Sequence, residues 1–178
     1  MTPFEAAILA TLQKQPVYKD DKKPELAAAK AEQLEQLAVA IGKASLKPKL
    51  PVSNRDLASL LIMIAGRETH FSLRVADGHC FAWECDRGRA RGPWQQHRDN
   101  FTRPIWDQLH GLAFVEIQAQ SAADALARGY WTCNPQRTGV NDWTMATING
   151  YAGHRCGEVW DGLKLRMSDY VKIRRQLG

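Results

Sequence analysis

Residues 57–66 read LASLLIMIAG, a nearly uninterrupted apolar run around which the rest of the chain is arranged. Ser53 or Asn54 can cap the N-terminus of a helix that contains this run. A helix that is apolar on nearly all sides is buried at the centre of its domain. Gly66 weakens the end of this helix, and Glu68 lies there. We therefore expect a central buried helix that ends at an acidic side chain.

Length and composition are those of a single globular unit. The chain has 178 residues, of which 44% are hydrophobic and 24% are charged, which is enough to build a real core. No apolar run approaches the roughly 18 residues that a membrane span needs, and no signal peptide is visible at the N-terminus. The formal net charge of +5 suits an anionic partner, although charge alone does not specify one.

Helical periodicity predicts further helices around the central one. Residues 4–15 form a first short helix, and a solvated charged connection over residues 18–23 leads to a second helix over residues 25–44. Lys30 falls on the apolar stripe of this second helix, which we interpret as a packing helix without chemistry. The remaining helices are expected at residues 104–129 (broken near Gly111), 141–151 and 168–176.

The chain divides at a stretch with two prolines, residues 46–51, which cannot lie inside a helix. An N-terminal helical extension, residues 1–50, is expected to pack on a main body, residues 51–178. Residues 71–91 show no sustained period, and their glycines indicate an irregular lobe with short strands or a hairpin around residues 80–85. The expected fold class is α+β and mainly α-helical, with a small irregular or β lobe.

The sequence contains four cysteines, at Cys80, Cys85, Cys133 and Cys156. An even number suggests two disulfides, and we favour Cys80–Cys85 and Cys133–Cys156 among the three possible pairings. Four free thiols, or a zinc site that also uses His79 and His154, are the alternatives. The spacing matches no paired zinc pattern. Disulfides persist in oxidising compartments, which favours an extracytoplasmic location.

Glu68 is the leading candidate for catalysis. A carboxyl at the end of an apolar helix is partly removed from water, which should raise its pKa and favour the protonated form near neutrality. A protonated carboxyl is what a general acid needs in order to donate to a glycosidic oxygen. The alternative is a structural glutamate that pairs with a nearby base such as Arg67 or Arg74.

Three short segments within residues 55–157 resemble motifs of the lysozyme-like superfamily, which includes lytic transglycosylases and goose-type lysozymes. Glu-Thr-His-Phe-Ser at residues 68–72 resembles its Glu-Ser-x-Phe motif. Residues 86–95 match the goose-type spacing Asp-x-Gly-x-x-x-Gly-Leu-Met-Gln, with Pro-Trp in place of Leu-Met. Residues 146–153 are similar to its Ala-Tyr-Asn-Ala-Gly segment, with Ile148 where the Tyr would stand.

The resemblance implies a lysozyme-like fold and cleavage of the β-1,4 bond between N-acetylmuramic acid and N-acetylglucosamine in peptidoglycan. Glu68 would be the general acid, and Asp86, with Glu84 as second choice, would position water or stabilise the oxocarbenium-like state. No metal or organic cofactor is implied. The expected substrate-binding residues are Gln95, Trp94 (as a flat apolar face), Asn149, Tyr151 and His97. The other tryptophans with an expected core position are Trp106, Trp131, Trp143 and Trp160.

Several alternatives remain at this level. A lytic transglycosylase needs no second carboxylate, because the muramyl 6-hydroxyl attacks the anomeric carbon; Asp86 slightly favours hydrolysis. A peptidase pair of Cys80 with His97 or His110 has no helix N-terminus to activate the thiol. The remaining candidates are a scaffold that binds wall glycan without cutting it and a nucleic-acid-binding module using the basic residues between 87 and 91.

The expected partner is therefore the peptidoglycan glycan strand, with no nucleic acid. The combination of disulfides and no visible export signal is typical of a wall-degrading protein that is delivered by a phage lysis system or an interbacterial secretion apparatus. In the second case the producing cell would need a cognate inhibitor, or immunity-type protein, that plugs the cleft.

Overall fold

The computed structural model describes residues 1–17, 19–46, 49–76, 90–97, 115–133 and 142–178. The described chain is predominantly helical with one small antiparallel sheet of two strands, in agreement with the expected mainly α-helical α+β class. The elements are α1 (Pro3–Leu12), the 3-10 helices η1 (Lys19–Lys22) and η2 (Pro24–Leu26), α2 (Ala27–Ser45), α3 (Asn54–Thr69), α4 (Leu73–Ala76), β1 (Ala90–Arg91), β2 (Gln96–His97), α6 (Val115–Thr132), α8 (Trp143–Ala152) and α9 (Asp161–Gln176).

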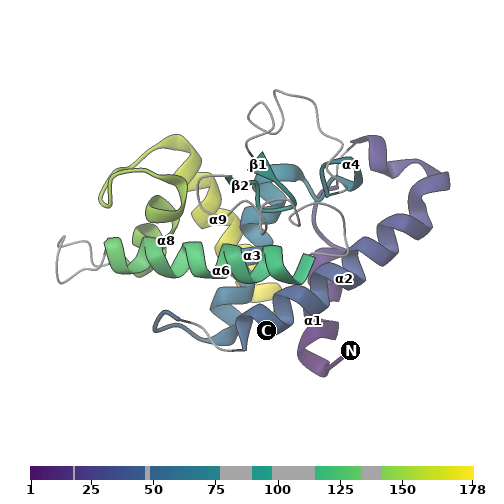
Figure 1. Ribbon diagram of the computed structural model, residues 1–178, viewed down its shortest axis with the longest axis horizontal. Coiled ribbons are helices and arrows are strands. Elements are labelled where there is room, and N and C mark those ends of the chain that lie inside the picture. The colour runs from purple at the N-terminus through teal and green to yellow at the C-terminus, as the bar shows by residue number, and fades with distance from the viewer. Residues whose placement is uncertain (18, 47–48, 77–89, 98–114, 134–141) are drawn as a thin grey trace.

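Helix α3 contains the whole apolar run and lies at the centre, with α2, α6 and α9 packed around it (Figure 1). Ser53 is its N-cap and accepts a hydrogen bond from the backbone N–H of Asp56 at 3.1 Å. Ten of its sixteen residues are buried, including every residue from Leu57 to Ala65. The prediction of a central buried helix is confirmed.

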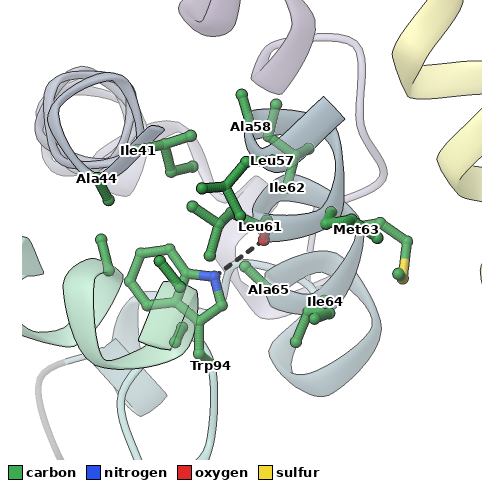
Figure 2. Close-up of a cluster of buried hydrophobic side chains, with 14 of the residues drawn as sticks. Ile41, Ala44, Leu57, Ala58, Leu61, Ile62, Met63, Ile64, Ala65 and Trp94 are labelled. Carbon is green, nitrogen blue, oxygen red and sulfur yellow. Dashed lines mark hydrogen bonds between the residues drawn. The ribbon is translucent and has the colours of Figure 1, made fainter. Parts of the chain in front are cut away.

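Trp94 is the largest fully buried side chain and lies against α3 (Figure 2). Its indole Nε1 donates a hydrogen bond of 2.9 Å to the carbonyl oxygen of Leu61. A buried indole needs such a partner, because an unpaired N–H in the core costs free energy. The expectation that Trp94 offers a flat face to a sugar ring is therefore wrong, since the ring is enclosed by the core.

Other helices are present with shifted ends. Helix α1 stops at Leu12 rather than at residue 15, because the next backbone N–H groups make tighter i−3 hydrogen bonds. Helix α9 begins at Asp161 rather than at residue 168; Gly162 leaves room there for the Trp160 ring, which a Cβ would approach to 1.8 Å. Helix α6 ends at Thr132, and the predicted part before residue 115 lies outside the described residues.

Helix α2 shares one hydrophobic core with α3 and α6, through Leu34, Leu37 and Ile41. Burying a side chain of this size contributes about 1.5–3 kcal/mol relative to leaving it in water. Lys30, on the same face, is also buried and pairs with Asp21 at 3.0 Å. The expectation of a solvated connection over residues 18–23 is wrong at Asp21, whose side chain is 4% exposed. The buried lysine draws this carboxylate inward, because a buried charge needs a partner.

Helices α6 and α8 cross at two glycines. A Cβ placed on Gly150 would lie 2.3 Å from the Cα of Gly129, so the two backbones touch and neither position accepts a side chain. This close approach brings the end of α8, with Tyr151, next to the last turn of α6. The crossing therefore fixes where the end of α8 meets the rest of the molecule.

Asp56 connects the start of α3 to the end of α9. Its Oδ1 accepts hydrogen bonds from the Tyr170 hydroxyl at 2.9 Å and from Nε of Arg174 at 2.6 Å. Burial tends to raise the pKa of Asp56, but hydrogen bonds from Ser53, Arg174 and Tyr170 outweigh it, and the net pKa is lowered. The ionised carboxylate therefore stabilises the fold.

Asp56→Asn should lower the free energy of unfolding by about 2 kcal/mol at pH 7, because charged hydrogen bonds are lost. The folded pKa lies below the unfolded value of 3.8, so this stabilisation is present above pH 3.8 and is lost as pH falls through the folded pKa. Urea unfolding at pH 7 and near pH 3 measures the difference. Asp124→Asn, at an exposed ion pair with Lys49, is the matched control. An equal cost at both pH values would contradict the assignment.

None of the helices in the described part of the chain is long and apolar enough to cross a bilayer.

Candidate active site

A pocket of about 330 Å³ lies at the C-terminal end of α3, and Glu68 is one of the residues that line it. Besides Glu68 of α3, the pocket is lined by the hairpin, by Ala125 of α6, by α8 with the segment that follows it, and by α9. The hairpin β1–β2 contributes its turn and second strand, α8 contributes its last turn, and α9 contributes the side chain of Arg166. The polar and aromatic residues that line it are Glu68, Trp94, Gln95, Gln96, His97, Tyr151, His154, Trp160 and Arg166.

The Glu68 side chain is 26% exposed and forms an ion pair with Arg166, whose Nη2 lies 2.7 Å from Oε1. Arg166 is itself only 16% exposed. The sequence had suggested Arg67 or Arg74 as structural partners, but Arg67 pairs with Asp169 at 2.5 Å instead. Glu68 therefore has a cationic partner within the fold, as the structural interpretation of this glutamate expected, and that partner is Arg166.

The hairpin turn Gly92–Gln95 forms one edge of the pocket. The strands pair with Ala90 opposite His97, and the N–H of Gln95 donates to the carbonyl of Gly92 at 3.0 Å. Gly92 has φ +71, and a Cβ there would lie 2.2 Å from Oε1 of Gln118, so only glycine fits. Thr69 donates to the carbonyl of Pro93 at 3.3 Å, which ties the turn to the end of α3 beside Glu68.

Tyr151 joins the hairpin to α8. Its hydroxyl donates to the carbonyl of Trp94 at 2.8 Å and accepts from Nε2 of Gln96 at 2.7 Å. Burial raises the pKa of the Tyr151 phenol, and the charge of Glu68 raises it further, so the phenol keeps its proton. Gln96 is 3% exposed, and its Oε1 has no hydrogen-bond partner among the described residues. This acceptor is buried, so a ligand reaches it only when the Gln96 side chain moves.

Asn149 lies beneath the pocket wall, fully buried. Its Nδ2 donates to the carbonyls of Cys156 and Glu158 at 3.0 and 2.9 Å, and its Oδ1 accepts from Nε1 of Trp160 at 2.9 Å. The amide is fully used inside the protein, so the expected direct sugar contact does not fit this position. Asn149 instead organises the segment that follows α8.

A disulfide between Cys133 and Cys156 ties this same segment to the end of α6, with 5.1 Å between the two Cα atoms. This confirms the second of the two predicted pairs and removes its thiols from any zinc site. Cys80, Cys85, Asp86 and Glu84 lie outside the described residues. Of the ten residues in the segment from Gly153 to Gly162, His154 and Trp160 line the pocket.

Several lining residues were missed from the sequence. Trp160 was expected in the core, yet it lies in the pocket wall with Arg166 5.8 Å from its ring centroid. Trp131 was also expected in the core and is 50% exposed. Gly153 ends α8 in a left-handed conformation with φ +73, and this helix-ending glycine was the available signal for a turn that redirects the chain toward the pocket. Nothing in the sequence marks Arg166 as a pocket residue, because a single arginine on a helix can serve many structural purposes.

No protein-family model, no curated protein and no solved structure matches this chain.

Proposed function

We propose that this protein is a peptidoglycan-degrading glycosidase of lysozyme-like fold, which cleaves the β-1,4 bond between N-acetylmuramic acid and N-acetylglucosamine. Glu68 is the general acid. It donates a proton to the glycosidic oxygen once the substrate has displaced Arg166 from its carboxylate. Cleavage then proceeds through an oxocarbenium-like state at C1 of the muramyl residue.

The observation that supports this proposal is that separate segments of the chain meet at one pocket. Three segments with similarity to lysozyme-like motifs, around Glu68, Gln95 and Tyr151, all contribute to one pocket although more than 80 residues separate the first from the last. The sequence similarity alone does not require these three segments to lie together, because short motifs that match by chance are not expected to meet in the folded protein. The carboxylate lies at the end of a buried helix, where a general acid is held rigidly.

The other lining groups suit an acetamido sugar. Oε1 of Gln96 is buried in the pocket wall without a partner among the described residues, and it can accept a hydrogen bond from the N–H of an N-acetyl group once the side chain turns toward the ligand. Gln95 and His97 add polar groups on the hairpin side. The net charge of +5 favours approach to an anionic wall. The disulfide favours an oxidising compartment, which is where peptidoglycan lies.

Hydrolysis is our first choice, and lytic transglycosylation with a 1,6-anhydromuramyl product is the alternative. An inverting hydrolase needs a second group that activates water, and Asp86 has motif support for this role. Among the described residues that line the pocket, Glu68 is the carboxylate. A transglycosylase uses one glutamate as acid and then as base, so the products decide between the two reactions.

Digestion of purified peptidoglycan followed by mass spectrometry of the soluble fraction tests the proposal. We expect muropeptides with reducing ends; ends lighter by one water identify the transglycosylase instead. A folded protein that releases no soluble muropeptides would overturn the enzyme assignment. Pelleting with insoluble peptidoglycan would then indicate a glycan-binding scaffold, and a mobility shift with DNA at physiological salt a nucleic-acid-binding module.

If the protein is a secreted antibacterial effector, its producer needs protection in the compartment where the enzyme acts. We propose a cognate inhibitor that inserts into the Glu68 pocket. A pull-down with the purified protein from the producing cell should recover it, and recovery should fall for a variant in which the pocket is filled.

A further inference from the structure

His154 lies in the wall of the Glu68 pocket, two residues after the end of α8. It is the first side chain after the helix-ending Gly153, and its backbone N–H donates to the carbonyl of Asn149 at 2.9 Å. The segment that carries it is fixed by the buried amide of Asn149 and by the disulfide at Cys156. His154 is therefore held on a rigid turn.

The imidazole itself is fixed on two sides. It stacks on Trp160, with 4.2 Å between ring centroids and 22° between ring planes. The indole cannot easily turn, because its Nε1 donates to Asn149 and its edge lies over Gly162. These contacts set the plane of the His154 ring relative to the pocket.

A carboxylate faces one nitrogen of this ring. Nδ1 of His154 lies 3.5 Å from Oε1 of Glu158, which is ion-pair range rather than a formed hydrogen bond. The other oxygen of Glu158 accepts the backbone N–H of Arg155 at 3.2 Å, which holds the carboxylate in place. Catalytic hydrogen bonds are often long without substrate and shorten in the reacting complex.

This arrangement has the features of an oriented base. A carboxylate that accepts a hydrogen bond from Nδ1–H leaves Nε2 as the unprotonated nitrogen that can take a proton. Glu158 lies on the same turn as His154, and Arg166 of α9 lies over the Trp160 ring and contacts Glu68. The pocket thus holds an acid candidate and a base candidate on different elements.

We infer that His154 is the general base that activates water in this pocket, oriented by Glu158 and Trp160. This inference rests on the proposed glycosidase function and assigns the second catalytic group to a histidine. Nε2 of His154 takes a proton from water while the water oxygen bonds to C1 of the muramyl residue. The C1–O4 bond breaks, its electron pair leaves with O4, and O4 takes the proton of Glu68. The products are a reducing end of inverted configuration and a free 4-hydroxyl, and solvent returns the proton from His154 to Glu68.

The test uses His154→Ala with and without sodium azide, on purified peptidoglycan. Azide attacks C1 as an anion and needs no base, so it bypasses the lost imidazole. We expect hydrolysis to fall by about 10²- to 10⁴-fold in the variant, and azide to restore soluble products that carry an azide at C1. A residue with a merely structural role would give no azide adduct.

His70→Asn is the matched control. His70 is exposed, lines a different cavity between the segment after α1, α3 and α9, and has a left-handed backbone that asparagine accepts. This variant should keep full hydrolysis. If circular dichroism shows that His154→Ala does not fold, His154→Gln is used in its place. The same loss of hydrolysis and the same azide adduct are expected.

The experiment distinguishes failure of the proposed function from failure of the role assigned to His154. A wild-type protein that releases no muropeptides overturns the proposed function. Wild-type products with 1,6-anhydro ends keep the glycosidase and overturn the role of His154 in water activation. A His154→Ala variant that hydrolyses at the wild-type rate, or one that is slow and forms no azide adduct, also overturns it.

Discussion

Glu68→Gln should reduce the release of muropeptides by about 10²- to 10⁴-fold, the usual contribution of a general acid. Gln has nearly the same shape as Glu but carries no acidic proton, so the leaving O4 departs without protonation. The amide oxygen can still accept a hydrogen bond from Arg166, which preserves the contact now made at 2.7 Å. The loss should therefore appear in the rate and leave the fold intact.

The rate is measured by mass spectrometry of soluble muropeptides over time, and the fold by circular dichroism and urea unfolding. Glu116→Gln is the matched control, because Glu116 forms an ion pair with Lys43 in which both side chains are 54% exposed. That change should leave both measurements nearly unaltered. If Glu68→Gln digested peptidoglycan as fast as the wild type, Glu68 would not be the acid.

The ion pair with Arg166 gives this pocket a resting state. The guanidinium lies 2.7 Å from Oε1 of Glu68, so the carboxylate has a structural partner. The guanidinium carbon of Arg166 also lies 5.8 Å from the centroid of the Trp160 ring. Under the proposed function, a substrate that reaches Glu68 displaces this arginine from the carboxylate.

The sequence predicted the parts of this pocket that depend on local patterns. The apolar run of α3 requires a buried helix, and a buried helix is observed there. The Cys133–Cys156 pair was also predicted. The positions of Trp94 and Asn149 were not, because their burial depends on which elements pack above them, and no local pattern carries that information.

The part of the pocket wall that contains His154 and Arg166 could not be predicted from local sequence patterns, for the same reason. Helix α9 brings Arg166 to Glu68 across 98 residues of sequence, and nothing near either residue indicates the contact. The largest such omission concerns Lys30. It was expected on a packing helix without chemistry, and the buried polar cluster that surrounds it holds the chain directly after Glu68.

Lys30 uses all three of its N–H groups inside the protein. Nζ donates to Oδ2 of Asp21 at 3.0 Å, to Oε1 of Gln33 at 2.8 Å and to the carbonyl of Phe71. Asp21 also accepts the N–H of Leu73 at 2.8 Å. The turn that these bonds hold is strained, since His70 and Phe71 both have left-handed backbones with φ of 48° and 55°. The cluster compensates for that strain and fixes the end of α3.

Lys30→Met should lower the free energy of unfolding by about 3–5 kcal/mol, because it leaves the carboxylate of Asp21 buried without a cation. The double variant Lys30→Met/Asp21→Asn should recover part of this loss, since a neutral amide can still accept from Leu73. Urea unfolding measures all three proteins. Lys43→Met, on the same helix but at an exposed ion pair, should cost less than about 1 kcal/mol.

The pH dependence of stability tests the same cluster independently. Burial lowers the pKa of Lys30, and its hydrogen bond and charge interaction with Asp21 only partly oppose this. The folded pKa therefore lies below the unfolded value of 10.5, and between the two the unfolded chain holds more protons. Stability from this group rises with pH in that interval. The difference in unfolding free energy between wild type and Lys30→Met should accordingly grow as pH increases toward 10.5. A difference that is constant with pH, together with a small cost at pH 7, would show that Lys30 is not buried against Asp21.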